Sequence, residues 1–133
     1  MIEIYDVFWE KALENLEAAQ SELLNHRYNS SANRSYYAAF QAAISALAQA
    51  GIRPRGPSGQ WGHDFVQAQF NGELINRRHR YPAELRPVLD QNYALRRAAD
   101  YTTERVTETR ADRAVTRTER FLDAVRPQGG ARS

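Results

Sequence analysis

Arg34 and Gln41 are the side chains whose types and spacing first suggest chemistry. The stretch from Tyr28 to Gly51, YNSSANRSYYAAFQAAISALAQAG, is alanine-rich and is predicted to form one long helix. Seven residues at about 100° each return to within about 20° of the start, so Arg34 and Gln41 point the same way, roughly 10 Å apart along the axis. A guanidinium binds phosphate well. An amide orients a water or a hydroxyl but does not titrate near neutral pH.

Small residues share this face of the predicted helix, at Ala38 and Ser45. Small side chains let another backbone come close, so the face could be a helix–helix seam, a dimer interface or the floor of a cleft. In the alternative interpretation, Arg34 simply extends to solvent at the start of the helix and Gln41 is a polar residue at its rim. Spacing alone leaves these interpretations open.

Three separated stretches resemble the HEPN domain family. NRSYYAAFQAA is similar to the family's central helix, in which an Arg, a pair of aromatics and usually a His follow one another as R-x-YYA-x-FHAA. GHDFV and RRAADY resemble two further stretches, in the right order, and the resemblance covers roughly residues 5 to 125. It implies an all-α bundle and a homodimer whose Arg and His residues face each other across a two-fold, forming a composite site for metal-independent RNA cleavage.

The sequence departs from this family at the residue that would transfer a proton. The family signature is an Arg followed by a His after four to six residues, and here Gln41 stands where the resemblance places the His. None of His26, His63 and His79 follows an Arg at that spacing. Loss of general acid–base help typically costs about 10²- to 10⁴-fold in rate. Gln41 is therefore interpreted as a degenerate catalytic position beside Arg34, and His63 or a residue of a partner as the remaining candidate for a base.

Basic residues gather in the middle of the chain. Residues 1–24 hold six acids against one lysine, whereas no acid lies between Glu22 and Asp64. The loop IRPRGPSGQWG carries two arginines and Trp61, and an arginine with an aromatic can hold a phosphate and stack on a base. The alternatives are a flexible connection whose Trp61 caps the core, and a solvated surface of mixed charge. The predicted nucleic-acid contacts are Arg34, Arg53, Arg55 and the three arginines of NRRHR, Arg77, Arg78 and Arg80.

Helices are expected to position all these residues, because no alternation of apolar and polar residues typical of strands appears between turn signals. The predicted fold is all-α, an up-and-down helical bundle of four main helices plus a short fifth helix. One domain is expected over residues 1–126, with a disordered C-terminal tail over 127–133. The expected helices are 4–24, 28–51, 64–71, a fourth that begins at Pro82 or, because of Pro87, at Glu84 or later and ends near residue 101, and a last one from 107 or 109 to 125.

Local signals predict where the helices end and which faces turn inward. We expect Asn29, Ser30 and Ser31 to cap the central helix, Gly51 to end it, and Gly72 to close the short helix. The inner face predicted for the first helix consists of Ile4, Phe8, Leu13, Leu16 and either Leu23 or Leu24. The inner face predicted for the central helix consists of Tyr37, Phe40, Ile44 and Leu47.

Composition limits the compartment and the cofactors. The 133 residues include no cysteine, and no window approaches the ~20 apolar residues that a membrane span requires. The N-terminus is acidic and lacks the basic region of a signal peptide, so a cytoplasmic protein is expected. No cofactor and no metal site are expected, because His63 and His79 are isolated from other ligands.

The resemblance and the departure together favour a catalytically impaired module that binds RNA or a protein partner in a toxin–antitoxin or defence system. Two other classes stay open: an active metal-independent endoribonuclease that uses another base, and a purely structural adaptor dimer. A nucleotidyltransferase-type antitoxin partner, encoded by a neighbouring gene, would favour the toxin-type interpretation. Its absence would favour the adaptor.

Overall fold

The protein is an all-α bundle. The computed structural model describes residues 2–56 and 59–127, and among them no strand occurs. The elements are α1 (Ile4–Leu24), α2 (Tyr28–Gln49), α3 (His63–Gln69), the π-helix η1 (Phe70–Arg77), the 3₁₀ turn η2 (Ala83–Leu85), α4 (Val88–Tyr101) and α5 (Glu108–Val125).

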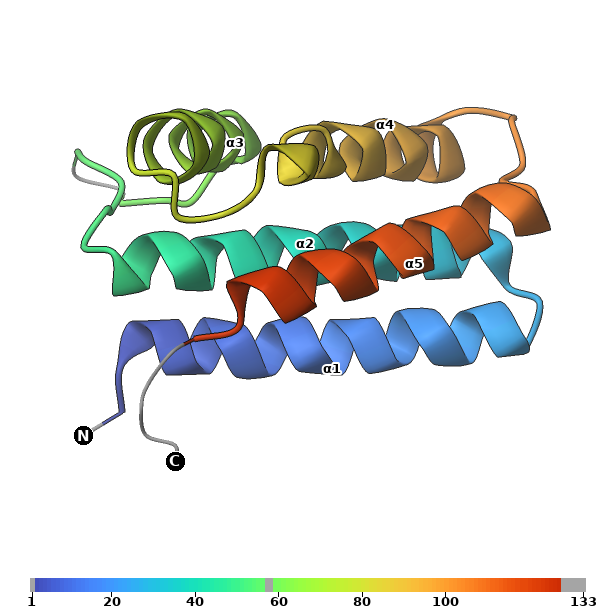
Figure 1. Cartoon of the computed structure of the whole chain (residues 1–133). Coiled ribbons are helices and arrows are strands. Elements are labelled where there is room, and N and C mark those ends of the chain that lie inside the picture. Colours follow the sequence, from blue (N-terminus) through green and yellow to red (C-terminus); the bar gives the residue numbers. More distant parts are fainter. Residues whose placement is uncertain (1, 57–58, 128–133) are drawn as a thin grey trace.

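Helix α2 is the centre of the bundle. It packs along α1 on one side and against α4 and α5 on others, while α3 and η1 cover its C-terminal half (Figure 1). Helices α3 and α4 follow one another along the same side of α2, and α5 runs back across the front of the bundle in this view. Successive long helices therefore alternate in direction, which is the up-and-down arrangement that the sequence predicts.

The central helix is buried nearly all round, and this changes the predicted inner face. Ile44 and Leu47 are buried as predicted, but Tyr37 and Phe40 are only half-buried, and Tyr36 is buried in their place. Alanines fill most of the remaining buried positions. Their small side chains let four neighbouring segments approach the α2 backbone, so no single apolar stripe marks the core.

Helix α1 has the predicted bounds, and its predicted inner face is confirmed in part, since Phe8, Leu13 and Leu16 pack half-buried against the core. Trp9, Ala12 and Ala19 are its buried residues, whereas Ile4 is 45% exposed and Leu24 is 80% exposed. Alanine at the seam again explains the difference, because close approach to α2 favours small residues over the larger ones that hydrophobicity alone selects.

Helix α2 starts where the sequence predicts, but its predicted caps are wrong. The helix begins at Tyr28, and Ser31 is fully buried one turn later, where its Oγ donates to the Ala19 carbonyl oxygen (2.8 Å). Asn29 accepts a hydrogen bond from the Val106 amide (2.9 Å) and so anchors the segment before α5. Ser31 thus binds α1, and Asn29 binds the segment before α5. Neither side chain caps the N-terminus of its own helix.

The predictions for the other helix ends are confirmed at some positions and wrong at others. Gly51 ends α2 with a left-handed φ of 82°, as predicted. Gly72 does not close the short helix, because the chain continues through it as the π-helix η1 to Arg77. The Thr107 side chain caps α5 by accepting from the Arg110 amide (3.2 Å). From residue 128 on, the predicted tail lies outside the described residues.

The prolines delay the fourth helix. After Pro82 the chain forms only the 3₁₀ turn η2, and α4 begins at Val88, directly after Pro87. Pro87 has no amide hydrogen and is tolerated only near the start of a helix.

Within the described ranges, no helix combines the length and the apolar content that crossing a bilayer requires.

Candidate functional site

Arg34 and Gln41 lie on one face of α2, as predicted, and one residue of α1 joins them. The Arg34 Nη1 donates to Asn15 Oδ1 (2.9 Å), and the Asn15 Nδ2 donates to Gln41 Oε1 (2.7 Å). The single side-chain amide of Asn15 therefore holds both Arg34 and Gln41 in place. Sequence reasoning missed it, although a lone Asn between the small residues Ala12 and Ala19 of an amphipathic helix was an available signal.

The small-residue face around these side chains is a seam within one chain. Ala38 and Ser45 are completely buried against α1, and the Ser45 Oγ donates to the Tyr5 carbonyl oxygen (2.7 Å). Of the three interpretations that the sequence leaves open, the structure supports the helix–helix seam. The face therefore gives no support to a dimer interface.

Arg34 has no carboxylate partner among the residues that the structure describes. Besides Asn15, its guanidinium donates to Asn33 Oδ1 from both Nε (3.1 Å) and Nη2 (2.6 Å). All these acceptors are neutral amide oxygens. Asn33 in turn donates to Asp100 Oδ2 (2.8 Å), which ties this network to the end of α4. The guanidinium is thus held in place, but its charge is not neutralised by its own partners.

Tyrosines and arginines from α2 and α4 gather beside Arg34. We call Arg34, Tyr37, Arg96, Arg97 and Tyr101 the tyrosine–arginine cluster. The guanidinium carbons of Arg34 and Arg96 each lie 5.3 Å from the Tyr37 ring centroid. Those of Arg96 and Arg97 lie 5.7 and 5.3 Å from the centroid of Tyr101, which is 63% exposed. Cations over tyrosine faces are stabilised by the ring quadrupole, so the cluster presents ordered charge and an open aromatic surface together.

The stretch RRAADY supplies three members of this cluster that sequence reasoning did not assign to a site. Arg96 Nε lies 3.3 Å from Asp100 Oδ2, an ion pair without the alignment of a hydrogen bond. Asp100 thus connects to both Arg96 and Asn33. The spacing of Arg96 and Asp100 predicts their pairing, but their approach to Arg34 depends on how α4 docks on α2.

His63 lies on a different side of α2. Tyr36, its hydrogen-bond partner at Nδ1 (3.0 Å), follows Arg34 by two residues, or about 200° around the helix. The His63 Nε2 contacts Asp90 Oδ1 (3.2 Å), and its ring stacks on Tyr93 with centroids 3.9 Å apart. Burial raises the pKa of Tyr36 far above its ordinary value, so the phenol keeps its proton. The structure does not bring His63 to Arg34 and Gln41, and both ring nitrogens already have protein partners.

The other predicted arginines gather at the far end of α2. Arg53 and Arg55 line an open groove of about 800 Å³ together with Phe65. Arg78 donates to the Ala50 carbonyl oxygen (3.4 Å), so NRRHR lies beside this loop, and Arg80 is exposed. Ala50 is sixteen residues beyond Arg34, about 24 Å along the helix. The predicted nucleic-acid residues therefore form two separate groups.

Part of the charge at this far end is already paired. Glu73 binds Arg77 (2.9 Å) and lies 3.6 Å from Arg78. Trp61 packs edge-to-face on Phe8 and Phe65, which agrees with its interpretation as a cap on the core. The tyrosine–arginine cluster is thus the better candidate for binding an anion, because its charges are ordered mainly by rings and amides.

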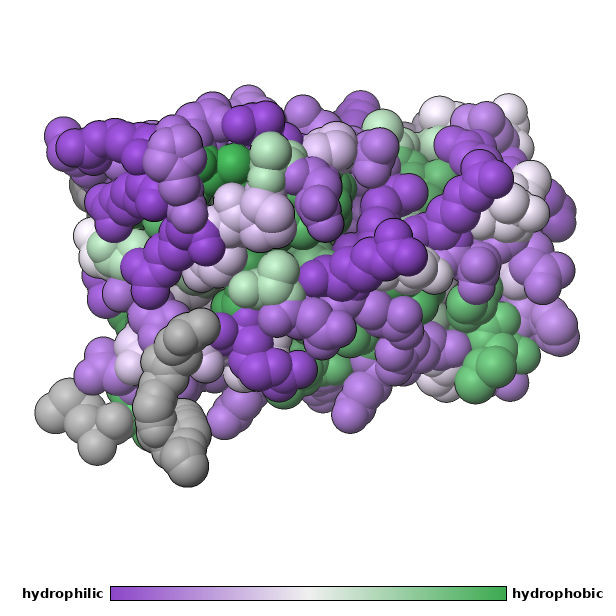
Figure 2. Space-filling model, viewed as in Figure 1, coloured by the Kyte–Doolittle hydropathy of each residue, from purple (hydrophilic) through white to green (hydrophobic). Residues whose placement is uncertain are grey.

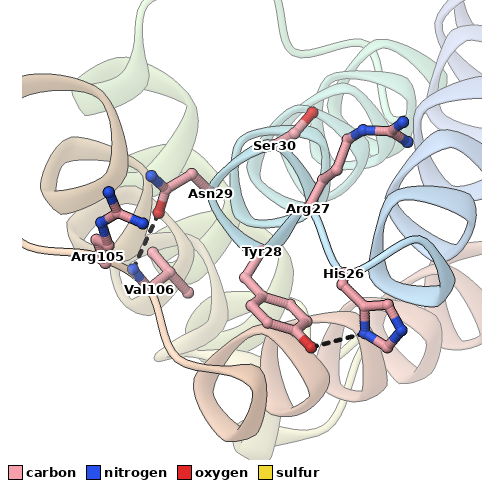
Figure 3. A pocket seen from close by; sticks show the side chains of 7 residues that line it. All are labelled: His26, Arg27, Tyr28, Asn29, Ser30, Arg105 and Val106. Atoms are coloured by element: carbon pink, nitrogen blue, oxygen red, sulfur yellow. Dashed lines mark hydrogen bonds between the residues drawn. The ribbon is translucent and has the colours of Figure 1, made fainter.

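A further hollow lies at the turn between α1 and α2 (Figure 3). Its volume is about 350 Å³, and it is lined by His26, Arg27, Tyr28, Asn29, Ser30, Arg105 and Val106. Its polar groups largely satisfy one another, since His26 Nδ1 bonds to Tyr28 Oη (2.9 Å) and Asn29 to the Val106 amide (2.9 Å). We assign this hollow a structural role in joining the turn to the approach of α5.

Comparison with known proteins gives two findings. The profile of the HEPN domain matches residues 5–128. The protein named "Putative toxin MJ0605" from Methanocaldococcus jannaschii is 31% identical over 120 residues, which cover 88% of this chain and 82% of the relative.

Proposed function

Because the chain belongs to the HEPN domain family, we propose that it is a toxin-like protein that binds single-stranded RNA at the tyrosine–arginine cluster. The observation that carries the proposal is the guanidinium of Arg34, which Asn15 and Asn33 hold without an opposite charge. It shares the Tyr37 ring with Arg96, and the Arg96 guanidinium also lies over exposed Tyr101. An ordered arginine can donate two parallel hydrogen bonds to one phosphate, and the face of a tyrosine ring can stack on a base. Single-stranded RNA offers both groups on one molecule.

The α2 position beside Arg34 where the family has a His offers no group that transfers protons. Gln41 accepts from Asn15 and has no titratable atom, so the Arg34 side of the site can bind a phosphodiester without supplying a general base. General acid–base catalysis typically contributes about 10²- to 10⁴-fold. We therefore place this protein among HEPN proteins with weak or no RNA cleavage, acting in a toxin–antitoxin or defence system, with a nucleotidyltransferase-type antitoxin as the proposed partner.

Binding of a labelled uridine tetranucleotide tests the proposal. We expect Arg34→Ala to weaken binding at least about fivefold at 0.1 M monovalent salt, because each phosphate contact with a single strand releases roughly 0.7 counterion. The matched control is Arg27→Ala, which removes an arginine whose side chain is 62% exposed and lies outside the cluster. Absence of binding by the native protein at low salt would overturn the proposal.

Cleavage is tested separately with purified protein and total cellular RNA, with and without EDTA. We expect little or no cleavage in either condition. Robust cleavage that survives EDTA and disappears in Arg34→Ala would show an active, metal-independent enzyme and would refute the proposed impairment. Circular dichroism of each variant checks that the helical fold is retained.

A further inference from the structure

A second basic surface runs between α4 and α5. Two adjoining hollows of about 320 and 290 Å³ share Gln91 and Arg117 and so form one groove. We call it the α5 arginine groove after the four arginines that line it, Arg110, Arg113, Arg117 and Arg120. Steps of three, four and three residues place all four on one face of α5 over about 15 Å. Figure 2 shows strongly hydrophilic side chains over α5 in this view.

Arg117 is fixed at the centre of the groove. Its Nε donates to Asn92 Oδ1 (2.7 Å), and Asn92 is itself buried and donates to Thr118 Oγ1 (2.8 Å). Burial, with the nearby charge of Arg110, lowers the pKa of Arg117. The neighbouring positive charges thus repel each other in the free protein, and an anion between them would relieve that repulsion.

Most of this charge has no carboxylate partner. Arg110 lies 3.4 Å from Glu104, but within the described parts of the chain no acidic group forms an ion pair with Arg113, Arg117 or Arg120. The lining includes one acid, Glu84, at the end near Arg120. Elsewhere the groove offers Gln91 and small or apolar α4 residues.

One turn of α4 separates the groove from the tyrosine–arginine cluster. Ala94 lines it at the Arg110 end, and Arg97 lies one turn further along α4, where it stacks over Tyr101. A polyanion whose base stacks on Tyr101 can therefore continue into the groove. No aromatic residue lines the groove, so the contacts it offers are to phosphates and not to bases. This continuity favours a nucleic-acid strand over an acidic peptide.

We infer that the α5 arginine groove binds the phosphate backbone of single-stranded RNA and extends the cluster into a longer, sequence-independent track. The inference rests on the proposed function, because the cluster supplies the start of the track. It predicts that affinity rises with RNA length beyond what the cluster alone can contact.

Two double variants with the same loss of charge test the groove. Arg113→Gln with Arg120→Gln removes two exposed arginines from it, and Lys11→Gln with Arg126→Gln removes two positive charges elsewhere. Arg117 is left intact because it is anchored to buried Asn92. Binding of labelled uridine oligomers of 4 and 15 nucleotides is measured by fluorescence anisotropy over a salt series.

We expect the groove variant to bind the 15-mer about 25-fold more weakly than the native protein at 0.1 M salt, and its salt slope to fall by about 1.4, because two phosphate contacts are lost. Binding of the 4-mer should be unchanged in both variants, and the control variant should bind the 15-mer nearly as tightly as the native protein.

Failure of the groove and failure of the cluster give different results. If the native protein binds the 4-mer and the two double variants bind the 15-mer equally, the groove inference is wrong and the cluster stands. If 4-mer binding is absent but the 15-mer binds and is lost in the groove variant, the groove is supported and the cluster is refuted. A glutamate 15-mer that binds as tightly as the RNA would overturn the assignment of RNA as the ligand.

Discussion

The replacement Gln41→His gives the sharpest test of how this site works. Gln41 and Arg34 bond to the two ends of the Asn15 amide, at 2.7 and 2.9 Å. Since the oxygen and nitrogen of one amide are about 2.5 Å apart at most, the two side-chain tips lie no more than roughly 8 Å from each other. A histidine at position 41 would therefore place a titratable nitrogen within roughly 8 Å of the Arg34 guanidinium.

We expect Gln41→His to raise metal-independent RNA cleavage by about 10²- to 10⁴-fold over the native protein, the usual contribution of general acid–base catalysis. Products should end in a 2′,3′-cyclic phosphate, because the base would act on the ribose 2′-hydroxyl. As a base, the imidazole works only when neutral, so the rate should rise with pH through about 6.5 and then level off. Loss of the Gln41 hydrogen bond should lower stability by about 1 kcal/mol.

The assay uses a labelled RNA in EDTA, with products resolved on a gel from pH 5 to 8. Adding Arg34→Ala to Gln41→His should abolish the gain, because the phosphate loses its cation, and His63→Ala should leave the gain intact. If the native protein already cleaves as fast as Gln41→His, the interpretation of Gln41 as a degenerate catalytic position is refuted. His63 would then be the next base to mutate.

Four further outcomes follow from the geometry. Asn15→Leu should destabilise the fold by about 1–3 kcal/mol in urea unfolding, because it leaves half-buried polar groups of Arg34 and Gln41 unpaired. Arg34→Met should weaken tetranucleotide binding at least about fivefold, as Arg34→Ala does, and should lower stability by about 1–3 kcal/mol, because the Asn15 and Asn33 oxygens lose this donor. A loss of stability without a loss of binding would show a purely structural role. Burial raises the pKa values of Tyr36 and Tyr81 above 10.0, so the stability contributed by these two neutral phenols should be fully present below pH 10 and be lost above it, and a melting temperature that does not drop between pH 9 and 11 would contradict this. Light scattering should show a homodimer at tens of micromolar, as the family resemblance implies, and a strict monomer would contradict it.

The sequence predicts the helices well because their signals are local. Gly51 and Thr107 act through their own backbone conformation or side chain, and α1 and α5 have nearly the expected bounds. Inner faces are harder to predict, since a helix surrounded by other helices has no polar side to set its rotation. The alanines of α2 show this: they are buried all round, although hydrophobicity assigns the core to Tyr37 and Phe40.

The candidate site is predicted only in part, for a related reason. Arg34 and Gln41 share a helix, so their common face follows from helical spacing. Asn15 and Tyr101 belong to other helices, and their approach depends on how α1 and α4 dock on α2. The π-helix η1 is similarly unforeseen, because Gly72 is a typical helix end and only its surroundings carry the chain through it.

The stability of the fold does not by itself explain why the half-buried guanidinium of Arg34 is paired with neutral amides. A half-buried guanidinium loses hydration, and an ion pair is the usual compensation for that loss. Here the acceptors are the amides of Asn15 and Asn33, which provide hydrogen bonds but no opposite charge. An apolar side chain of similar length would fill the same seam without the loss of hydration, although the Asn15 and Asn33 oxygens would lose this donor. The arrangement therefore suits an anion that completes the pairing, and the exposed ring of Tyr101, which connects to Arg34 through Arg96 and Tyr37, favours a nucleotide over a simple ion.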